Sequence, residues 1–106
     1  MVESFDSERS RYASLGVVES LPAALIDSIW LIIDLDLKGV IPLTNMLYFD
    51  LIDNGGKVTV HFSQEISDVQ MAVDLPFPYS ENYPSQVFAF DDGNKETILL
   101  PAEMLE

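Results

Sequence analysis

His61 is the single histidine of this 106-residue chain and the side chain best suited to proton transfer near neutral pH. General-base catalysis also needs a nucleophile, an orienting acid and an oxyanion site around the imidazole. Apolar and polar side chains alternate through this stretch, which places His61 on the face opposite Val60 and Phe62. We therefore expect His61 to be a solvated strand residue, and the sequence predicts no catalytic residue and no enzyme.

Gln64 and Glu65, which precede Asp68, form a second polar group. Their side chains could accept hydrogen bonds from a peptide or a basic partner. Polar residues of this kind are also common where strands end in turns. The pattern favours a structural role and leaves the binding role open.

The third polar group consists of oxygen-bearing side chains in a short span, which is typical of calcium ligands. These residues are Asp91, Asp92, Asn94 and Glu96. Gly93 comes too early for an EF-hand loop, and no bidentate Glu follows at the twelfth position. A hairpin turn explains the group, so the sequence predicts no metal site and no cofactor.

Asp27, Asp34 and Asp36 are the carboxylates of the most apolar stretch, for which a helix is predicted below. Asp27 and Asp34 share one helix face but lie two turns apart, about 10 Å at 1.5 Å per residue. We expect them to form a solvated face.

Phe77, Tyr79 and Tyr83 lie among three prolines between residues 76 and 84. Such dense prolines exclude a central strand and predict a loop. Rigid aromatic side chains on a loop suit partner contact, because they lose little entropy on binding. These three residues are the predicted binding site, although the same rings could instead fold back and cap the core.

The charge balance narrows the classes of partner. The chain has 18 acidic and 5 basic residues and a formal net charge of −13. Phosphate backbones and anionic membranes would be repelled, so we expect neither direct nucleic-acid binding nor membrane binding. A basic protein partner would be attracted. Acidity also keeps small proteins soluble, which is the plainer explanation.

Cysteine is absent, which excludes disulfides and cysteine-ligated zinc. Charged residues interrupt the first twenty positions, so no signal peptide is predicted, and a cytoplasmic location is expected. The length predicts a single domain over residues 11–106, preceded by a flexible N-terminus at residues 1–10.

The elements that must position these groups follow from periodicity. Residues 11–18 predict a short strand with a bulge or edge position at Gly16, and residues 21–38 a helix capped by Ser20. Alternating stretches then predict strands at residues 46–53, 57–64, 69–75, 86–90 and 96–100. The sequence therefore predicts an α+β fold, in which one N-terminal helix packs on one face of a mainly antiparallel sheet of about five to six strands.

Several motifs, in chain order, resemble those of a bacterial family known as domain of unknown function 960. They are Arg11-Tyr12, Gly16-Val17, Trp30-Leu31-Ile32-Ile33-Asp34, Leu47-Tyr48-Phe49-Asp50-Leu51, Ser63-Gln64-Glu65, and the C-terminal Asp91-Asp92-Gly93 followed by Thr97-Ile98-Leu99-Leu100-Pro101 and Glu103. The family pattern has a His two residues before the Gln-Glu pair, where this chain has Phe62. The resemblance implies the fold and a bacterial cytoplasmic setting, and it implies no activity.

Two classes of function stay open. The first is a non-enzymatic interaction module that binds an unidentified protein partner, with a basic one favoured, through the aromatic loop or an exposed sheet face. The alternative is an acidic nucleic-acid mimic that inhibits a DNA-binding protein or nuclease, because residues 58–94 carry six acidic residues and no Lys or Arg. The wide apolar arc of the helix also predicts a homodimer.

Overall fold

A six-stranded sheet with its α-helices on one face forms the protein. The computed structural model describes Phe5, residues 9–65 and residues 67–105. The elements follow the order β1 (Ser10–Ala13), α1 (Leu15–Ser20), α2 (Ala23–Leu31), η1 (Ile32–Leu37), β2 (Met46–Asn54), β3 (Lys57–Gln64), β4 (Ser67–Pro78), β5 (Gln86–Asp91), β6 (Lys95–Leu99) and η2 (Pro101–Leu105). The predicted flexible N-terminus lies largely outside the described residues.

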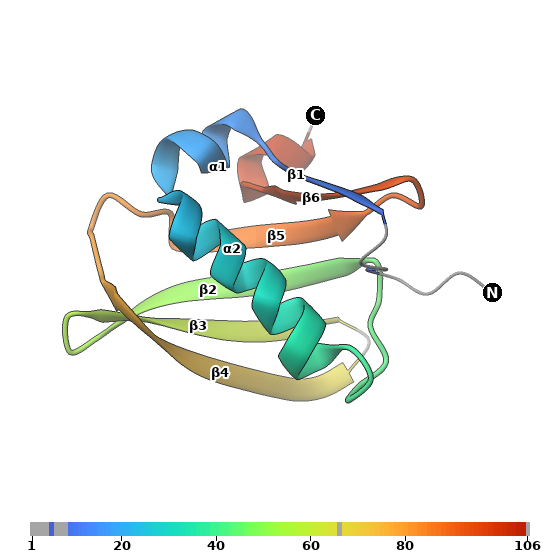
Figure 1. Ribbon diagram of the computed structural model, residues 1–106, viewed down its shortest axis with the longest axis horizontal. Coiled ribbons are helices and arrows are strands. Elements are labelled where there is room, and N and C mark those ends of the chain that lie inside the picture. Colours follow the sequence, from blue (N-terminus) through green and yellow to red (C-terminus); the bar gives the residue numbers. More distant parts are fainter. Residues whose placement is uncertain (1–4, 6–8, 66, 106) are drawn as a thin grey trace.

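The strand order in the sheet is β1-β6-β5-β2-β3-β4 (Figure 1). Every pairing is antiparallel except that of β1 with β6. The α+β fold and the mainly antiparallel sheet are therefore confirmed. The parallel pairing joins the first strand to the last. It places Arg11 opposite Glu96, about 85 residues later in the chain.

The sequence prediction of one N-terminal helix is wrong, because two α-helices lie between β1 and β2. The predicted strand at 11–18 ends at Ala13, and a helix begins at Leu15. Ser14 caps that helix by accepting a hydrogen bond on its hydroxyl from the backbone N–H of Val17, at 3.2 Å. The cap outweighs the strand preference of Val17 and Val18.

The predicted helix at 21–38 corresponds to α2 and the π-helical turn η1 that continues it. Pro22 is its N-cap, and Ser20 instead belongs to α1, where its hydroxyl donates to the carbonyl of Gly16 at 2.6 Å. Gly39, with a φ of +81°, lies just after the helix, at a conformation that glycine adopts without steric cost. None of the helices in the described ranges is long and apolar enough to cross a membrane.

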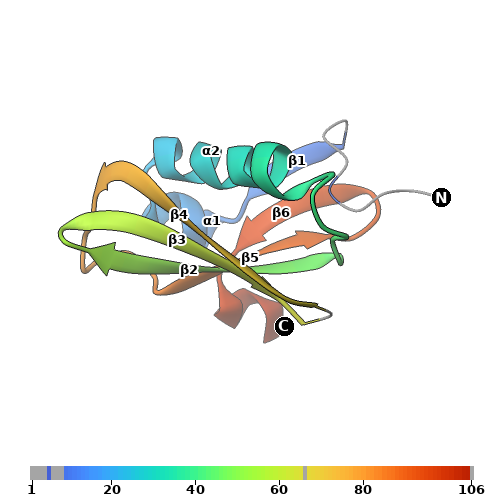
Figure 2. The ribbon, with the colours of Figure 1, turned by 90° about the horizontal axis from the view of Figure 1, so that it is seen from below.

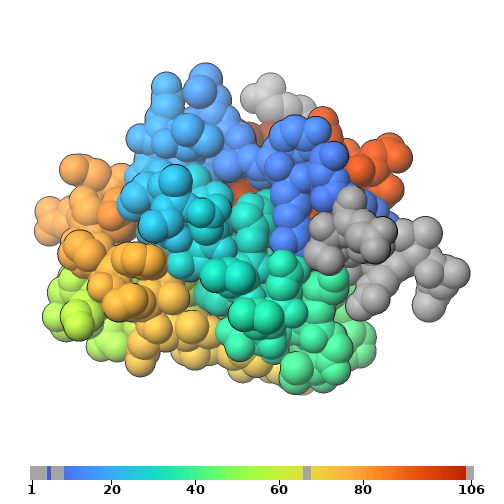
Figure 3. Space-filling model, in the orientation of Figure 1, coloured from blue at the N-terminus to red at the C-terminus, as the bar shows by residue number. Residues whose placement is uncertain are grey.

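The hydrophobic core lies between α2–η1 and one face of the sheet (Figure 2). Apolar residues alternate along each central strand, so one face of β2, β3 and β5 is buried. Figure 3 shows this side of the molecule filled by α1, α2 and η1, with β4 beside them. The fully buried core side chains include Leu25, Ile29, Ile33, Leu37, Leu47, Phe49, Val58, Val87, Ala89 and Ile98.

The predicted loop at 76–84 begins later than expected, because β4 continues through Pro76 and Pro78. β4 is an edge strand, and a proline's missing N–H costs nothing where no neighbouring strand needs it. A tight turn joins the antiparallel strands β2 and β3, with Gly55 and Gly56 at φ values of +61° and +91°.

Candidate functional site

The sheet face opposite α2 carries the candidate site, and we call it the open face. Because side chains alternate, the open face presents the residues between the core positions of the central strands. Figure 2 shows α2 on one side of the sheet and η2, beside the label C, on the other. The open face of β2, β3 and β5 includes the half-buried residues Met46, Tyr48, Asp50, His61, Ser63, Gln86 and Phe88.

Two aromatic rings form the centre of this site. Tyr48 of β2 lies opposite Phe88 of β5, with ring centroids 4.9 Å apart and planes tilted by 60°. Together with Met46, Gln86 and Met104 they line a hollow of about 280 Å³, which we call the Tyr48–Phe88 hollow. Its floor is apolar and aromatic, and its polar groups are the Tyr48 phenol and the Gln86 amide.

Met104 reaches this hollow from η2, which the carboxylate of Glu103 fixes in place. One oxygen of Glu103, Oε1, accepts from the hydroxyl of Ser14 at 2.6 Å and from the backbone N–H of Leu100 at 2.7 Å. These hydrogen bonds, first that from Ser14, lower the pKa of Glu103. Gly16 packs closely against Leu100 and Glu103, so an added Cβ would lie 2.8 Å from Leu100 Cδ1.

A row of polar side chains crosses four strands beside the hollow. Gln86 Nε2 donates to Asp50 Oδ1 at 2.9 Å, and Asp50 Oδ2 lies 3.4 Å from His61 Nδ1. The other ring nitrogen of His61 lies 3.0 Å from Gln70 Oε1 on β4. His61 is thus on the polar face, as predicted, but an aspartate and an amide hold it. The row can orient the imidazole of His61. The side-chain amide of Gln70 lies where a catalytic dyad would have a nucleophilic hydroxyl.

The Gln-Glu pair divides between the two faces of the sheet. Gln64 is buried, accepts from the backbone N–H of Thr44 at 3.0 Å and donates to the carbonyl of Pro42 at 2.9 Å. It therefore fastens the segment that leads into β2. Glu65 is exposed and accepts a 2.5 Å hydrogen bond from the hydroxyl of Tyr48, which raises the pKa of Tyr48.

The aromatic residues predicted to bind a partner lie elsewhere. Phe77, Tyr79 and Tyr83 are half-buried and pack against the hydrophobic core. Tyr79 and Tyr83 contact each other edge to face, with centroids 6.0 Å apart. All three rings therefore lie at the core margin, and none of them lines the Tyr48–Phe88 hollow.

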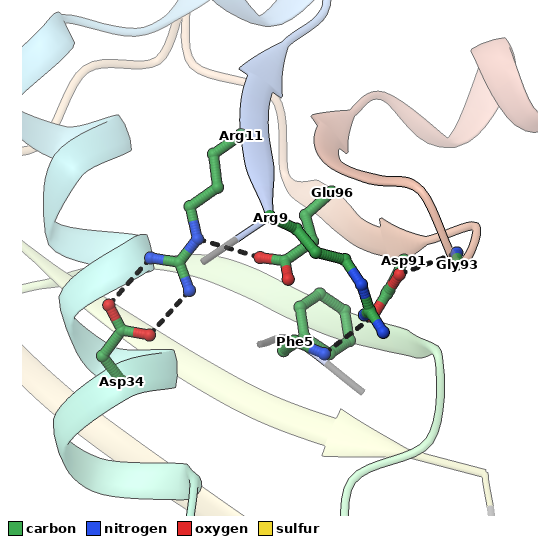
Figure 4. Close-up of polar contacts among 7 residues, drawn as sticks. All are labelled: Phe5, Arg9, Arg11, Asp34, Asp91, Gly93 and Glu96. Carbon is green, nitrogen blue, oxygen red and sulfur yellow. Dashed lines mark hydrogen bonds and ion pairs between the residues drawn. The ribbon is translucent and has the colours of Figure 1, made fainter. Parts of the chain in front are cut away.

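The acidic residues considered as calcium ligands are engaged within the protein (Figure 4). Asp91 is buried, pairs with Arg9, and accepts hydrogen bonds from the backbone N–H groups of Phe5 and Gly93 at 2.7 and 2.8 Å. Asp92 accepts from the backbone N–H groups that follow it in the turn, and these bonds lower its pKa. Within residues 9–65 and 67–105, no three potential ligand side chains converge as a metal site would require.

Glu96 and Asp34 both bind Arg11, which links β1, β6 and the helix (Figure 4). Arg11 Nε donates to Glu96 at 2.8 Å, and its two terminal nitrogens each donate to Asp34 at 2.7 Å. The guanidinium also stacks over Trp30, 4.7 Å from the ring centroid. Asp34 is therefore part of an ion pair that lowers its pKa, so its predicted place on a solvated face is wrong.

Glu96 is fully buried, and its second carboxylate oxygen has no hydrogen-bond partner within the described chain. Burial is the main cause of its raised pKa, which Arg11 partly offsets. Arg11 is itself held charged, chiefly by the hydrogen bond from its guanidinium to Asp34, which raises its pKa. The cluster is a structural clamp, because its charges are turned toward one another.

Four residues that line the hollow were not predicted as site residues: Met46, Gln86, Phe88 and Met104. Two signals could have found part of the hollow: Tyr48 and Phe88 occupy polar-face positions of predicted strands, and aromatic residues there are unusual without a reason. Met104 gave no such signal, because its position depends on the fold of the chain's end.

Comparisons with known proteins identify relatives without a known role. A family model described as "Staphylococcal protein of unknown function (DUF960)" matches residues 10–103. A crystal structure described as a protein of unknown function from Enterococcus faecalis is 76% identical, covers 100% of both chains and superposes with a TM-score of 0.97. No curated protein matches the chain.

Proposed function

Because the chain belongs to the staphylococcal family of unknown function DUF960, which brings no assigned activity, we propose that it is a non-enzymatic protein-interaction module. It binds a protein partner through the open face of the sheet. The observation that carries this proposal is the Tyr48–Phe88 hollow, an apolar and aromatic recess on the sheet face that α2 does not cover.

The composition of the hollow supports a protein partner. Aromatic residues and methionine are enriched where protein interfaces are fully buried. The aromatic residues bury a large area with few rotatable bonds. Tyr48 and Phe88 are also held by strand pairing, so binding needs little ordering of the protein. Met46 and Met104 are flexible and can adapt to the shape of a partner side chain.

The polar row beside the hollow supports binding over catalysis. The ring nitrogens of His61 contact Asp50 and Gln70, and the carboxylate of Asp50 also accepts from Gln86. Such a row presents directed hydrogen-bonding groups on a rigid surface, which is what specificity at an interface requires.

The proposal is tested by capturing partners from a lysate of a bacterium that carries the gene and titrating the purified partner. Phe88→Glu introduces a charge into the hollow and is expected to weaken binding at least tenfold, as for a residue at the centre of an interface. Leu35→Glu is the matched control, because Leu35 is 72% exposed on the helix side. Circular dichroism establishes that both variants fold.

Ser63→Arg is a second variant that leaves the aromatic pair intact. Ser63 lies opposite Tyr48 on the open face, so a long side chain there obstructs the hollow without removing core contacts. Equal affinities for the wild type, Phe88→Glu and Ser63→Arg would place the binding surface elsewhere and refute the proposal.

The acidic nucleic-acid mimic is the alternative proposal, and the same captured material separates the two. A mimic would capture a DNA-binding protein or nuclease, compete with DNA, and bind much more weakly as salt rises. A partner held by the hollow would depend on Phe88 and would not compete with DNA.

A further inference from the structure

Both polar residues that line the Tyr48–Phe88 hollow are held by carboxylates. The hydroxyl of Tyr48 donates to Glu65 at 2.5 Å, and the amide of Gln86 donates to Asp50 at 2.9 Å. One oxygen of each carboxylate is used in these bonds. The hollow therefore has an apolar floor and two negative charges at its rim.

No cation of the described chain neutralises this rim. Within the described residues, Glu65 has no ion pair with Lys or Arg, and the only basic group beside Asp50 is His61, at 3.4 Å. Glu65 is exposed, and among the described residues its second oxygen accepts no hydrogen bond. The chain as a whole carries a formal charge of −13, so its field also attracts cations.

We propose that the hollow is a subsite for one arginine or lysine side chain of an extended basic segment in a protein partner. This inference rests on the proposed function. The aliphatic stem of such a side chain would pack on Met46, Met104 and Phe88, because these long side chains bury their stems and keep the charged head at the surface. The charged head would meet the ring of Tyr48 and the carboxylate of Glu65.

Size and charge favour this occupant over others. A hollow of about 280 Å³ lies at the lower limit of small-molecule pockets and suits one long side chain better than a cofactor. An acidic side chain would be repelled by Glu65 and Asp50. An uncharged apolar side chain would fill the floor but leave both rim carboxylates without a counter-charge.

The test uses two pentapeptides, acetylated at the N-terminus and amidated at the C-terminus, of sequence Gly-Ser-X-Ser-Gly, with X as arginine or its neutral isostere citrulline. Binding is followed by NMR of the wild-type protein labelled at the methionine methyl groups, since Met46 and Met104 line the hollow. The arginine peptide is expected to shift both methyl signals and to bind about fivefold more tightly than the citrulline peptide.

Two charge-neutralising variants separate local from general attraction. Glu65→Gln is expected to weaken the arginine peptide about fivefold and to leave the citrulline peptide unchanged. Asp53→Asn removes the same charge five residues further along β2, about 17 Å from Tyr48 at 3.3–3.4 Å per residue, and is expected to leave both peptides unchanged.

Three results would each overturn the subsite. They are equal binding of the two peptides, equal effects of the two variants, and the absence of methyl shifts from Met46 and Met104. None of these results bears on whether a protein partner depends on Phe88, so failure of the subsite is distinguishable from failure of the proposed function. A loss confined to the arginine peptide and to Glu65→Gln supports the subsite.

Discussion

Replacing Arg11 by methionine is expected to destabilise the protein strongly at neutral pH. The change removes the 2.8 Å hydrogen bond to Glu96 and both 2.7 Å hydrogen bonds to Asp34. Methionine keeps most of the aliphatic stem, so the loss is mainly that of charge. Glu96 is 0% exposed, so its ionised form would be left buried without the guanidinium that hydrogen-bonds to it.

The magnitude follows from this burial. Breaking a buried ion pair by removing one partner costs about 3–5 kcal/mol, because the remaining charge is left desolvated. Asp34 is more exposed, with 28% of its side chain accessible, so its share is at most about 1 kcal/mol. Domains of this size have a free energy of unfolding of about 5–15 kcal/mol, so the variant is expected to fold with a clearly lower stability.

The pH dependence has a definite sign. Burial raises the folded-state pKa of Glu96, so ionisation of Glu96 costs stability above that pKa and protonation at lower pH removes the cost. Arg11 lowers the pKa of Asp34, so the stability from that pair is present above the unfolded-state pKa and is lost as pH falls through the folded-state value. The difference between wild type and Arg11→Met should therefore be largest near neutral pH and shrink toward about pH 4.

Urea unfolding, followed by circular dichroism and by the fluorescence of Trp30, measures this difference. The double variant Arg11→Met with Glu96→Gln is the control, since it removes the unpaired charge. It should recover about 1–3 kcal/mol of the loss. A loss below about 1 kcal/mol, or one that is the same near pH 7 and pH 4, would show that Arg11 does not hold Glu96 as a buried charge.

Two further substitutions test the hydrogen bonds that position the elements. Gln64→Ala leaves the backbone N–H of Thr44 and the carbonyl of Pro42 without their partner and should cost about 1–3 kcal/mol in urea unfolding. Glu65→Gln is its matched neighbour and should change stability by less than about 0.5 kcal/mol. Gly93→Ala should cost about 1 kcal/mol or more by thermal unfolding, because Gly93 has a φ of +96° with open space around it. If Gly93→Ala left the thermal stability unchanged, the backbone of this turn would have adapted to the new side chain.

Periodicity predicted the sheet well but not the first helix. The strands of residues 46–64 alternate clearly because one face is buried and the other is polar. Residues 11–18 have no such clear pattern, and the cap at Ser14 decides their structure. The hydroxyl of Ser14 also donates to Glu103, 89 residues away, and local preferences carry no information about such a contact.

The candidate site was harder to predict than the fold for the same reason. Tyr48 and Phe88 could be assigned to one face from alternation, but their pairing depends on which strands are neighbours, and β2 pairs with β5 across two intervening strands. Composition alone favoured the loop of Phe77, Tyr79 and Tyr83 as a binding site. Its rings pack against the hydrophobic core, a contact that composition does not reveal.

The motifs by which the chain resembles its family divide into two kinds once the structure is known. Arg11, Asp34 and Gln64 point inward or toward one another, and their contacts account for their presence as parts of the scaffold. Tyr48 and Glu65 differ, because they bind each other on the open face, and neither is needed to fill the core. A hydrogen bond between an exposed carboxylate and a half-buried phenol contributes little to stability, since water competes for both groups. Its clearest physical effect is to fix a negative charge beside an aromatic hollow, and for that reason the open face is the part of the molecule where function should be sought.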